Sequence, residues 1–168
     1  METDYDVAII GGGIVGLAQA WMAARRGYKV AVFEKTSIAQ GATVRNFGMI
    51  WPIGQPAGEL YEVAKRSREF WLELADAGAL DVETCGSIHL AHKEDEMQVL
   101  QEFVDQQTHP ATLISPAEIC QRSGLVNPEG LLGGMVSDTE LRVDPRTAAE
   151  RIHRWLAREF SVQFHFET

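Results

Sequence analysis

The sequence predicts an α/β protein whose parallel sheet is interrupted by an α+β segment. Three observations support this fold class. The chain opens with a Val- and Ile-rich run, a glycine turn, an apolar helical stretch and a second apolar run. The middle of the chain alternates short strand-like and helix-like segments without internal repeats. A capped helix and a strand with one apolar face stand last in the sequence.

The first elements form a βαβ pattern. Residues 6–10 are rich in Val and Ile, which is typical of a buried parallel strand. Residues 14–26 predict a helix that ends at Gly27, because glycine is the preferred residue after a helix C-terminus. Residues 28–33 predict a second buried strand, which leads into an acidic residue. Residues 36–55 are rich in glycine and proline and predict a loop.

The remaining helices are predicted from apolar residues spaced three and four apart, and two of them from a cap residue followed by proline. The predicted helices span residues 59–77, 93–107, 115–123 and 144–158, and the predicted strands span residues 86–91, 112–114, 131–136 and 160–166. The apolar stripe expected in the first of these helices consists of Leu60, Val63, Ala64, Phe70, Trp71 and Leu74.

Composition excludes several classes of protein. The 168 residues are 45% apolar and 23% charged, which is typical of a globular domain, and the net charge of −9 disfavours a nucleic-acid partner. Residues 7–24 are apolar enough to suggest a membrane span, but three glycines at 11–13 predict a strand–turn–helix instead. The acidic N-terminus is unlike a signal peptide, and the unpaired Cys85 and Cys120 suit a reducing compartment, so we expect a cytoplasmic protein without an integral membrane segment.

A GxGxxG motif occupies the turn after the first strand. Gly11 permits the tight turn, Gly13 lets the backbone approach a pyrophosphate, and Gly16 lets the helix pack close to the strand. The helix N-terminus then presents free N–H groups to the phosphates. Glu34 ends the second strand at about the spacing where an acid accepts hydrogen bonds from a ribose, which disfavours NADP. The motif leaves FAD and NAD as alternatives.

The next segment favours FAD, because residues 41–50 form a glycine-bearing loop where a nicotinamide dehydrogenase usually begins a crossover helix. With GGGIVGL at 11–17, FEK at 33–35 and GATVRNFGMI at 41–50, the sequence resembles the D-amino-acid oxidase and glycine oxidase superfamily of FAD-dependent oxidoreductases. Weaker similarities extend to residues 86–90 and 142–145. The resemblance implies a Rossmann-like FAD-binding domain in segments 1–84 and 141–168, interrupted by a partial substrate domain at 85–140.

The resemblance also implies which residues meet the cofactor, in addition to the three glycines. The backbone of Ile14 and Val15 is expected to contact the pyrophosphate, and Glu34 and Lys35 the ribose and adenine. Ala42 and Thr43 are expected to contact the phosphate and ribitol side of the cofactor. Phe47, Gly48 and Met49 are expected to lie against the isoalloxazine. No residue of the chain is assigned a catalytic acid–base role, because the flavin carries the chemistry in such enzymes.

The implied reaction is oxidation of the C–N bond of a small amine or amino acid by hydride transfer to flavin N5, with oxygen or another compound as the final electron acceptor. The segment RNFGMIWPIGQP at 45–56 resembles a subgroup associated with phosphonate catabolism, which makes an aminophosphonate a candidate substrate. Arg45 is a candidate for binding an anionic substrate, with pairing to a nearby acid as its alternative role. Trp51 is a candidate for lining the active site.

Family members are longer than this chain, so we expect an N-terminal portion that is inactive and binds FAD poorly by itself. The competing hypotheses are a flavin hydroxylase, an NAD-dependent dehydrogenase and a dinucleotide-binding module without catalysis. No metal site is expected, because His89 and His92 would face opposite sides of a strand. The sequence does not predict an oligomeric state.

Overall fold

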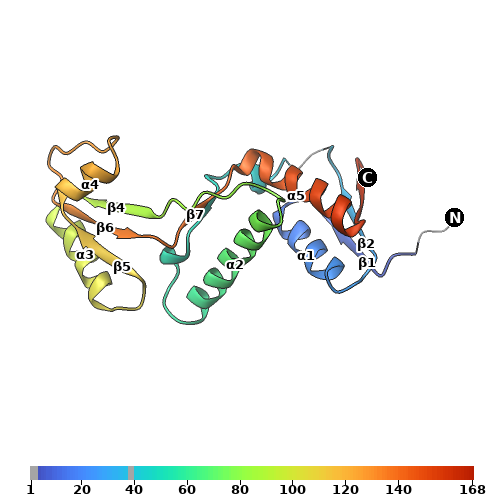
Figure 1. Ribbon diagram of the computed structural model, residues 1–168, viewed down its shortest axis with the longest axis horizontal. Helices are drawn as coiled ribbons and strands as arrows, with labels where there is room; N and C mark the ends of the chain where they lie inside the picture. The colour runs from blue at the N-terminus through green and yellow to red at the C-terminus, as the bar shows by residue number, and fades with distance from the viewer. Residues whose placement is uncertain (1–3, 38–39) are drawn as a thin grey trace. The chain divides into compact units, whose positions relative to one another are not determined.

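The computed structural model describes residues 4–37 and 40–168, which form two compact units (Figure 1). The first unit is drawn from Met1–Met49, Trp71–Val82 and Val143–Thr168, and the second from Ile50–Phe70 and Glu83–Arg142. Residues 50–70 thus belong to the second unit, and the finer division at residues 84 and 140 stays a prediction. Within the described residues, no helix has the length and apolar character that a membrane crossing requires.

The first unit is built on a three-stranded parallel sheet in the order β1-β2-β8, which confirms the predicted α/β class. Its strands are β1 (Val7–Ile10), β2 (Val30–Glu34) and β8 (Gln163–Phe166). The central strand β2 buries its first three residues, because it has a neighbour on each side. In register, Ile10 pairs with Phe33 and Glu34 pairs with Phe166. The carboxyl ends of all three strands therefore lie at one edge of the sheet.

Two helices pack together within the first unit, α1 (Ile14–Ala24) and α5 (Pro145–Phe160). Trp21 and Trp155 meet edge to face with their ring centroids 5.8 Å apart, a favourable geometry for two buried aromatic rings. The predicted N-cap of α5 is confirmed, since the Asp144 side chain accepts a hydrogen bond from the backbone of Arg146. Helix α1 ends two residues before the predicted end, and Gly27 adopts a positive φ of 86° just beyond it.

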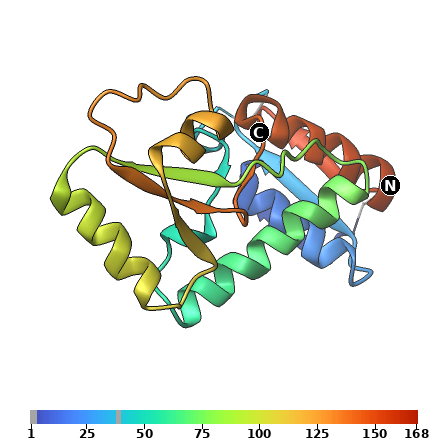
Figure 2. The same cartoon turned by 60° about the vertical axis from the view of Figure 1, so that its left-hand side comes forward.

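The second unit contains an antiparallel sheet in the order β4-β6-β5, formed by Ser87–Ala91, Gly133–Ser137 and Ala111–Ile114 (Figure 2). Helices α3 (Glu94–Asp105) and α4 (Pro116–Arg122) cover opposite faces. Two consecutive glycines on β6 point to opposite faces of the sheet, and each lies against one of these helices. A Cβ at Gly133 would lie 3.2 Å from Met97 Sδ on α3, and a Cβ at Gly134 would lie 3.0 Å from Ile119 Cδ1 on α4. Small residues here let both helices approach the central strand.

Helix α2 (Glu59–Asp76) forms where it is predicted, but part of its predicted apolar stripe is wrong. Leu60 and Val63 are 56% and 60% exposed, whereas Tyr61 and Leu74 are buried. Periodicity alone did not identify the buried face, because apolar residues occur on more than one side of this helix.

The predicted loop of residues 36–55 is confirmed as largely irregular. It contains only the short 3₁₀ turns η1 (Ala42–Val44) and η2 (Pro52–Gly54) and the two-residue strand β3 (Met49–Ile50), within its described part. Strand β3 pairs with β7 (Leu141–Arg142).

Candidate functional site: a dinucleotide cavity at the glycine turn

The glycine turn between β1 and α1 has the geometry that its motif predicts. Gly11 has a φ of 103°, and its amide donates a hydrogen bond to the Phe33 carbonyl at 2.8 Å. A Cβ at Gly16 would lie 2.0 Å from the Gly11 carbonyl oxygen. A side chain at either position would therefore disrupt the turn, the first through its backbone conformation and the second through a direct clash.

The N-terminus of α1 faces the loop that carries Thr43. Gly13 is the N-cap residue and has no side chain with which to cap the first turn of the helix. The Ile14 amide donates to Thr43 Oγ1 at 3.0 Å, and a Cβ at Gly13 would lie 3.0 Å from the same oxygen. The structure thus brings together the predicted phosphate residues Gly13, Ile14 and Thr43. The backbone contact expected of Val15 stays a prediction, and its side chain is 69% exposed.

Glu34 is fixed at the end of β2 by two neighbouring segments. Its Oε2 accepts a hydrogen bond from the Gly12 amide at 2.7 Å. Its Oε1 accepts from the Thr36 amide at 3.0 Å and from the Thr36 hydroxyl at 2.7 Å. The Thr36 hydroxyl, followed by the Gly12 amide, lowers the pKa of Glu34 below its ordinary value, so this carboxylate is ionised at neutral pH. An ionised carboxylate is a suitable acceptor for ribose hydroxyl groups.

The Glu34 hydrogen bonds predict a pH-dependent stability. Because the pKa is lower in the folded state, the stabilisation is present above the unfolded pKa of about 4.5 and is lost as the pH falls through the folded pKa. When the pH is lowered from neutral to below 4.5, the free energy of unfolding should fall less in Glu34→Gln than in the wild type. Urea titrations of the two apoproteins at each pH measure this difference.

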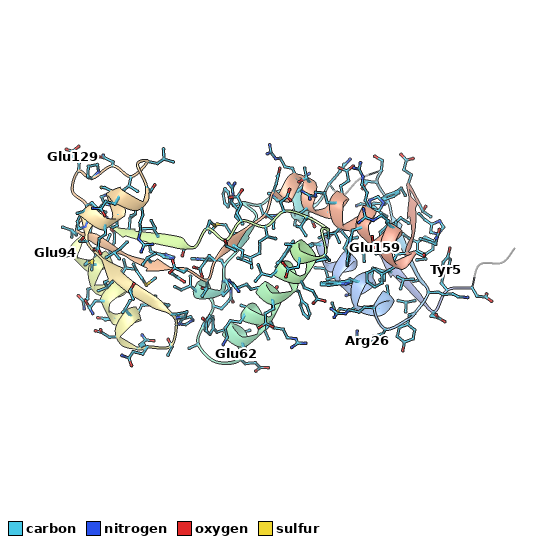
Figure 3. All side chains as sticks on the ribbon, in the orientation of Figure 1. Tyr5, Arg26, Glu62, Glu94, Glu129 and Glu159 are labelled. Carbon is cyan, nitrogen blue, oxygen red and sulfur yellow. The ribbon has the colours of Figure 1, made fainter. Side chains whose placement is uncertain are left out.

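Glu129→Gln is the matched control for this measurement, because Glu129 is an exposed carboxylate of the second unit (Figure 3). The control variant should keep the acid dependence of the wild type. Equal acid dependence in the wild type and in Glu34→Gln would contradict the proposed role of the Glu34 hydrogen bonds in stability.

An open cavity of about 500 Å³ lies beside the glycine turn and contains several predicted cofactor residues. Its lining consists of Gly13, Glu34, Lys35, Thr36, Gln40, Gly41, Ala42, Thr43 and Arg45. Glycine, hydroxyl and charged groups from three separate segments therefore converge on one space. Among the described residues, Arg45 has no ion-pair partner, so the expected alternative of pairing to a nearby acid is not observed there.

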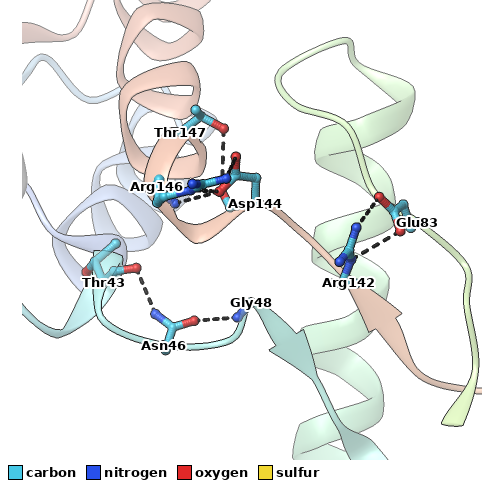
Figure 4. Close-up of polar contacts among 8 residues, drawn as sticks. All are labelled: Thr43, Asn46, Gly48, Glu83, Arg142, Asp144, Arg146 and Thr147. Atoms are coloured by element: carbon cyan, nitrogen blue, oxygen red, sulfur yellow. Dashed lines mark hydrogen bonds and ion pairs between the residues drawn. The ribbon is translucent and has the colours of Figure 1, made fainter. Parts of the chain in front are cut away.

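The loop that follows the cavity is held by an asparagine that sequence reasoning missed. Asn46 Nδ2 donates to the Thr43 carbonyl oxygen at 2.8 Å, and Asn46 Oδ1 accepts from the Gly48 amide at 2.7 Å (Figure 4). Asn46 Nδ2 also donates to the Ala42 carbonyl oxygen at 3.0 Å. The available signal was the Asn-x-Gly spacing, since an asparagine side chain commonly bonds the backbone two residues later. Asn46 therefore orders the segment that precedes Phe47.

Gly48 has a structural role that differs from its predicted contact with a flat ring. Its φ is 71°, and the Val143 amide donates to its carbonyl at 2.9 Å. A Cβ at this position would lie 1.9 Å from the Val143 carbonyl oxygen. The adjacent Phe47 and Met49 are 86% and 56% exposed, so two large apolar side chains are presented by this loop. Their contact with an isoalloxazine stays a prediction.

A smaller cavity, of about 160 Å³, shares the glycine turn and extends toward β8 and α5. It is lined by Gly12, Ser37, Ala149, Glu150, His153, Arg154, Phe164 and Phe166. His153 contacts both phenylalanines edge on, at centroid distances of 4.4 and 5.1 Å. Burial is the main cause that lowers the pKa of His153, which favours the neutral ring at pH 7. An aromatic wall thus stands next to the acid-bearing end of β2.

The cavity at the glycine turn fits a dinucleotide. A Cβ at Gly13 would lie 3.0 Å from Thr43 Oγ1, so glycine lets the Thr43 hydroxyl, which accepts from the Ile14 amide, lie beside the N-terminal amides of α1. Those amides and the helix dipole favour an anion such as a pyrophosphate. Glu34 supplies the hydroxyl acceptor expected for a ribose, at the edge of the same cavity. The remaining site candidate, Trp51, belongs to the second unit and is 42% exposed.

Comparison with known proteins identifies relatives that are longer than this chain. A glycine oxidase of Bacillus licheniformis is 31% identical over 111 residues, which cover 61% of this chain and 30% of that protein. The solved glycine oxidase from Bacillus cereus ATCC 14579 is similar with a TM-score of 0.85 and 25% identity, over 98% of this chain and 48% of that one. The chain therefore spans about a third to a half of the relatives it matches.

Two further comparisons bear on fold and cofactor. An L-amino acid deaminase from Proteus vulgaris shares the fold with a TM-score of 0.83 and 21% identity, over 99% of this chain and 45% of that one. An L-alpha-glycerophosphate oxidase from Mycoplasma pneumoniae with FAD bound shares the fold with a TM-score of 0.79 and 23% identity. The match covers 100% of this chain and 46% of that one. The family model of FAD dependent oxidoreductases (DAO) matches residues 6–168, which decides between FAD and NAD as the cofactor. The chain belongs to this family of FAD dependent oxidoreductases.

Proposed function

We propose that the protein oxidises the C–N bond of a small amine or amino acid, with FAD held in the cavity beside the glycine turn. The observation that carries the proposal is the convergence of Gly13, Thr43 and Glu34 on one cavity. Membership of the family, together with relatives named as glycine oxidases, supports an amine as the substrate class. Oxygen or another electron acceptor would complete the cycle.

The residues of the chain hold and orient the cofactor in this proposal. When bound, FAD supplies the electron acceptor for a hydride leaving the carbon of the C–N bond. The α1 amides after Gly13 bind the pyrophosphate, and Glu34 with Lys35 binds the ribose and adenine end. Ala42 and Thr43 contact the phosphate and ribitol side. Phe47, Gly48 and Met49 form the segment along the ring.

We further propose that the substrate carries an anionic group, with an aminophosphonate as the leading candidate, and that Arg45 binds this group. Its guanidinium is exposed and has no ion-pair partner among the described residues. A planar guanidinium suits a phosphonate or carboxylate, because it donates two parallel hydrogen bonds. Trp51 is retained as a lining residue on the substrate side.

The experiment uses the full-length protein that contains this chain. Absorbance bands in the blue and near-ultraviolet are expected from bound FAD. Anaerobic addition of glycine, sarcosine, a D-amino acid or an aminophosphonate should bleach the blue band for a true substrate. A flavin that none of these amines bleaches would contradict the proposed reaction, and a colourless protein would contradict cofactor binding.

Arg45→Gln tests the anion site. We expect KM for an aminophosphonate to rise about tenfold or more, because a lost charge-assisted hydrogen bond costs about 1.5–3 kcal/mol. KM for an uncharged alkylamine should change little, and FAD content should stay normal. Arg122→Gln, a change at an exposed arginine of α4, is the control. Loss of FAD in Arg45→Gln would instead assign this arginine to the cofactor.

A further inference from the structure

The side chain of Asn46 is exposed, yet all three of its hydrogen bonds run to backbone groups of its own loop. Nδ2, the nitrogen end, donates to the carbonyls of Ala42 and Thr43, and Oδ1, the oxygen end, accepts from the Gly48 amide. Because a carbonyl only accepts and a backbone N–H only donates, this orientation of the side-chain amide is the one that satisfies all three contacts. The two ends of Asn46 therefore act on different parts of the loop.

The nitrogen end holds a wall of the cavity beside the glycine turn. The last carbonyls of a short helical turn lack partners within the turn, and η1 leaves its carbonyls in this position. Ala42 also accepts from the Arg45 amide at 3.1 Å, whereas Asn46 bonds the Thr43 carbonyl at 2.8 Å. Both Ala42 and Thr43 line the cavity of about 500 Å³. Asn46 thus fixes the backbone of two lining residues.

The hydroxyl of Thr43 is the polar group that this wall presents beside α1. Its oxygen accepts from the Ile14 amide at 3.0 Å, and a hydroxyl that accepts still has its own proton to donate. Within residues 4–37 and 40–168, this proton has no acceptor. The Ile14 amide lies at the positive end of the α1 dipole, and its hydrogen bond makes the hydroxyl a stronger donor. Thr43 therefore offers a phosphate oxygen a donor beside the helix N-terminus.

The oxygen end holds the segment that follows the cavity wall. Gly48 is buried, its amide donates to Asn46 at 2.7 Å, and its carbonyl accepts from the Val143 amide at 2.9 Å. Phe47 lies between these two fixed residues, and its side chain is 86% exposed. The backbone on both sides of Phe47 is therefore held while its ring faces outward.

We propose that Asn46 is a positioning residue for FAD and that its two ends act on the two halves of the cofactor. The nitrogen end holds Thr43 for the pyrophosphate, and the oxygen end holds residues 47–49 for the flavin ring. This inference rests on the proposed function, which places FAD in this cavity with its ring along residues 47–49. Asn46 acts through the backbone of its neighbours and has no contact of its own with the cofactor.

The first test separates the two ends of the side chain in the full-length apoprotein. Flavin fluorescence measures the affinity for FAD, and competition measures the affinity for ADP, which has the pyrophosphate but no flavin. Asn46→Ala removes all three hydrogen bonds, whereas Asn46→Asp removes the donors and keeps an acceptor for the Gly48 amide. We expect both variants to bind ADP about tenfold more weakly or worse, the effect of about one hydrogen bond.

The ratio of the ADP and FAD dissociation constants reports on the flavin half alone. Asn46→Ala should lose a further factor of about ten for FAD, because the segment at Phe47 is released. Asn46→Asp should lose the same factor for both ligands, since its new charge acts alike on two molecules that both carry the pyrophosphate. An unchanged ratio in Asn46→Ala, or normal ADP binding in both variants, would overturn the proposal.

The second test determines whether the nitrogen end acts through the Thr43 hydroxyl. Thr43→Val removes this hydroxyl at nearly constant volume and should weaken ADP binding about tenfold. If Asn46 acts through Thr43, adding Asn46→Ala to Thr43→Val should weaken ADP binding little further. A merely structural role of Asn46 would make the two effects multiply to about 100-fold, and that result would contradict the inference.

Asn127→Ala is the matched control. Asn127 Oδ1 accepts from the Glu129 amide at 3.1 Å, which is the same type of turn in the second unit, so this variant should bind FAD and ADP normally. Circular dichroism shows whether each variant is folded, and Asn46→Asp, which keeps the turn, carries the ADP test if Asn46→Ala does not fold. If the wild type binds neither ligand, the proposed function fails. If it binds both and the Asn46 variants bind them equally well, only this inference fails.

Discussion

Gly13→Val is expected to lower the affinity for FAD about 1,000-fold. A Cβ at Gly13 would already lie 3.0 Å from Thr43 Oγ1. The two methyl groups of valine would add further bulk beside the N-terminal amides of α1. The pyrophosphate would then lose about two hydrogen bonds to charged oxygens, each worth about 1.5–3 kcal/mol. A loss of about 4 kcal/mol corresponds to a factor of about 1,000 in the dissociation constant.

Flavin fluorescence titration of the full-length apoprotein measures this affinity. The matched control is Gly124→Val, because a Cβ at Gly124 has no neighbour within 4 Å. We expect the control to bind FAD as the wild type does, and circular dichroism should show both variants folded. Normal FAD content in Gly13→Val would refute the assignment of the pyrophosphate to this turn.

Gly48→Ala is expected to destabilise the protein by about 2–5 kcal/mol. The φ of 71° costs a residue with a side chain about 1–2 kcal/mol. The new Cβ would also lie 1.9 Å from the Val143 carbonyl oxygen and 2.9 Å from Pro145 Cδ, and overpacking of this kind costs about 1–3 kcal/mol. The backbone hydrogen bond from Val143 to Gly48 would be displaced as a result.

Urea unfolding of the apoprotein measures this loss directly as a lower transition midpoint. Gly41→Ala is the matched control, since Gly41 lies in the same loop with a φ of −79° and no atom within 4 Å of a Cβ. The control should unfold within about 0.5 kcal/mol of the wild type. If Gly48→Ala is as stable as Gly41→Ala, the contact with Val143 does not constrain this loop.

Local sequence patterns predicted the parts of the molecule whose function depends on backbone conformation. Gly11 and Gly16 were assigned correct roles because the φ of 103° and the 2.0 Å approach are consequences of lacking a side chain. The cap at Asp144 was equally predictable, since its partner amide lies two residues away. In each of these cases the cause and its effect lie within a few residues of each other.

Contacts between distant segments were not predictable in the same way. Glu140 bonds groups at positions 53 and 87, so no local pattern marks it as a buried acid. Thr43 was expected near the cofactor. Its hydrogen bond with the Ile14 amide was not predictable, because the two residues are 29 positions apart and meet only when the loop that carries Thr43 folds back onto α1. Leu60 and Val63 were misassigned because helical periodicity defines faces without indicating which one is covered.

The pairing of β2 with β8 has a consequence for how the protein folds during synthesis. Residues 31–34 pair with residues 163–166, so more than a hundred intervening residues must emerge before this ladder can close. Until then β2 lacks its second neighbour, and the closure of so long a loop carries an entropic cost. We therefore expect the antiparallel sheet β4-β6-β5 of the second unit, whose strands lie between residues 87 and 137, to acquire structure first on the ribosome.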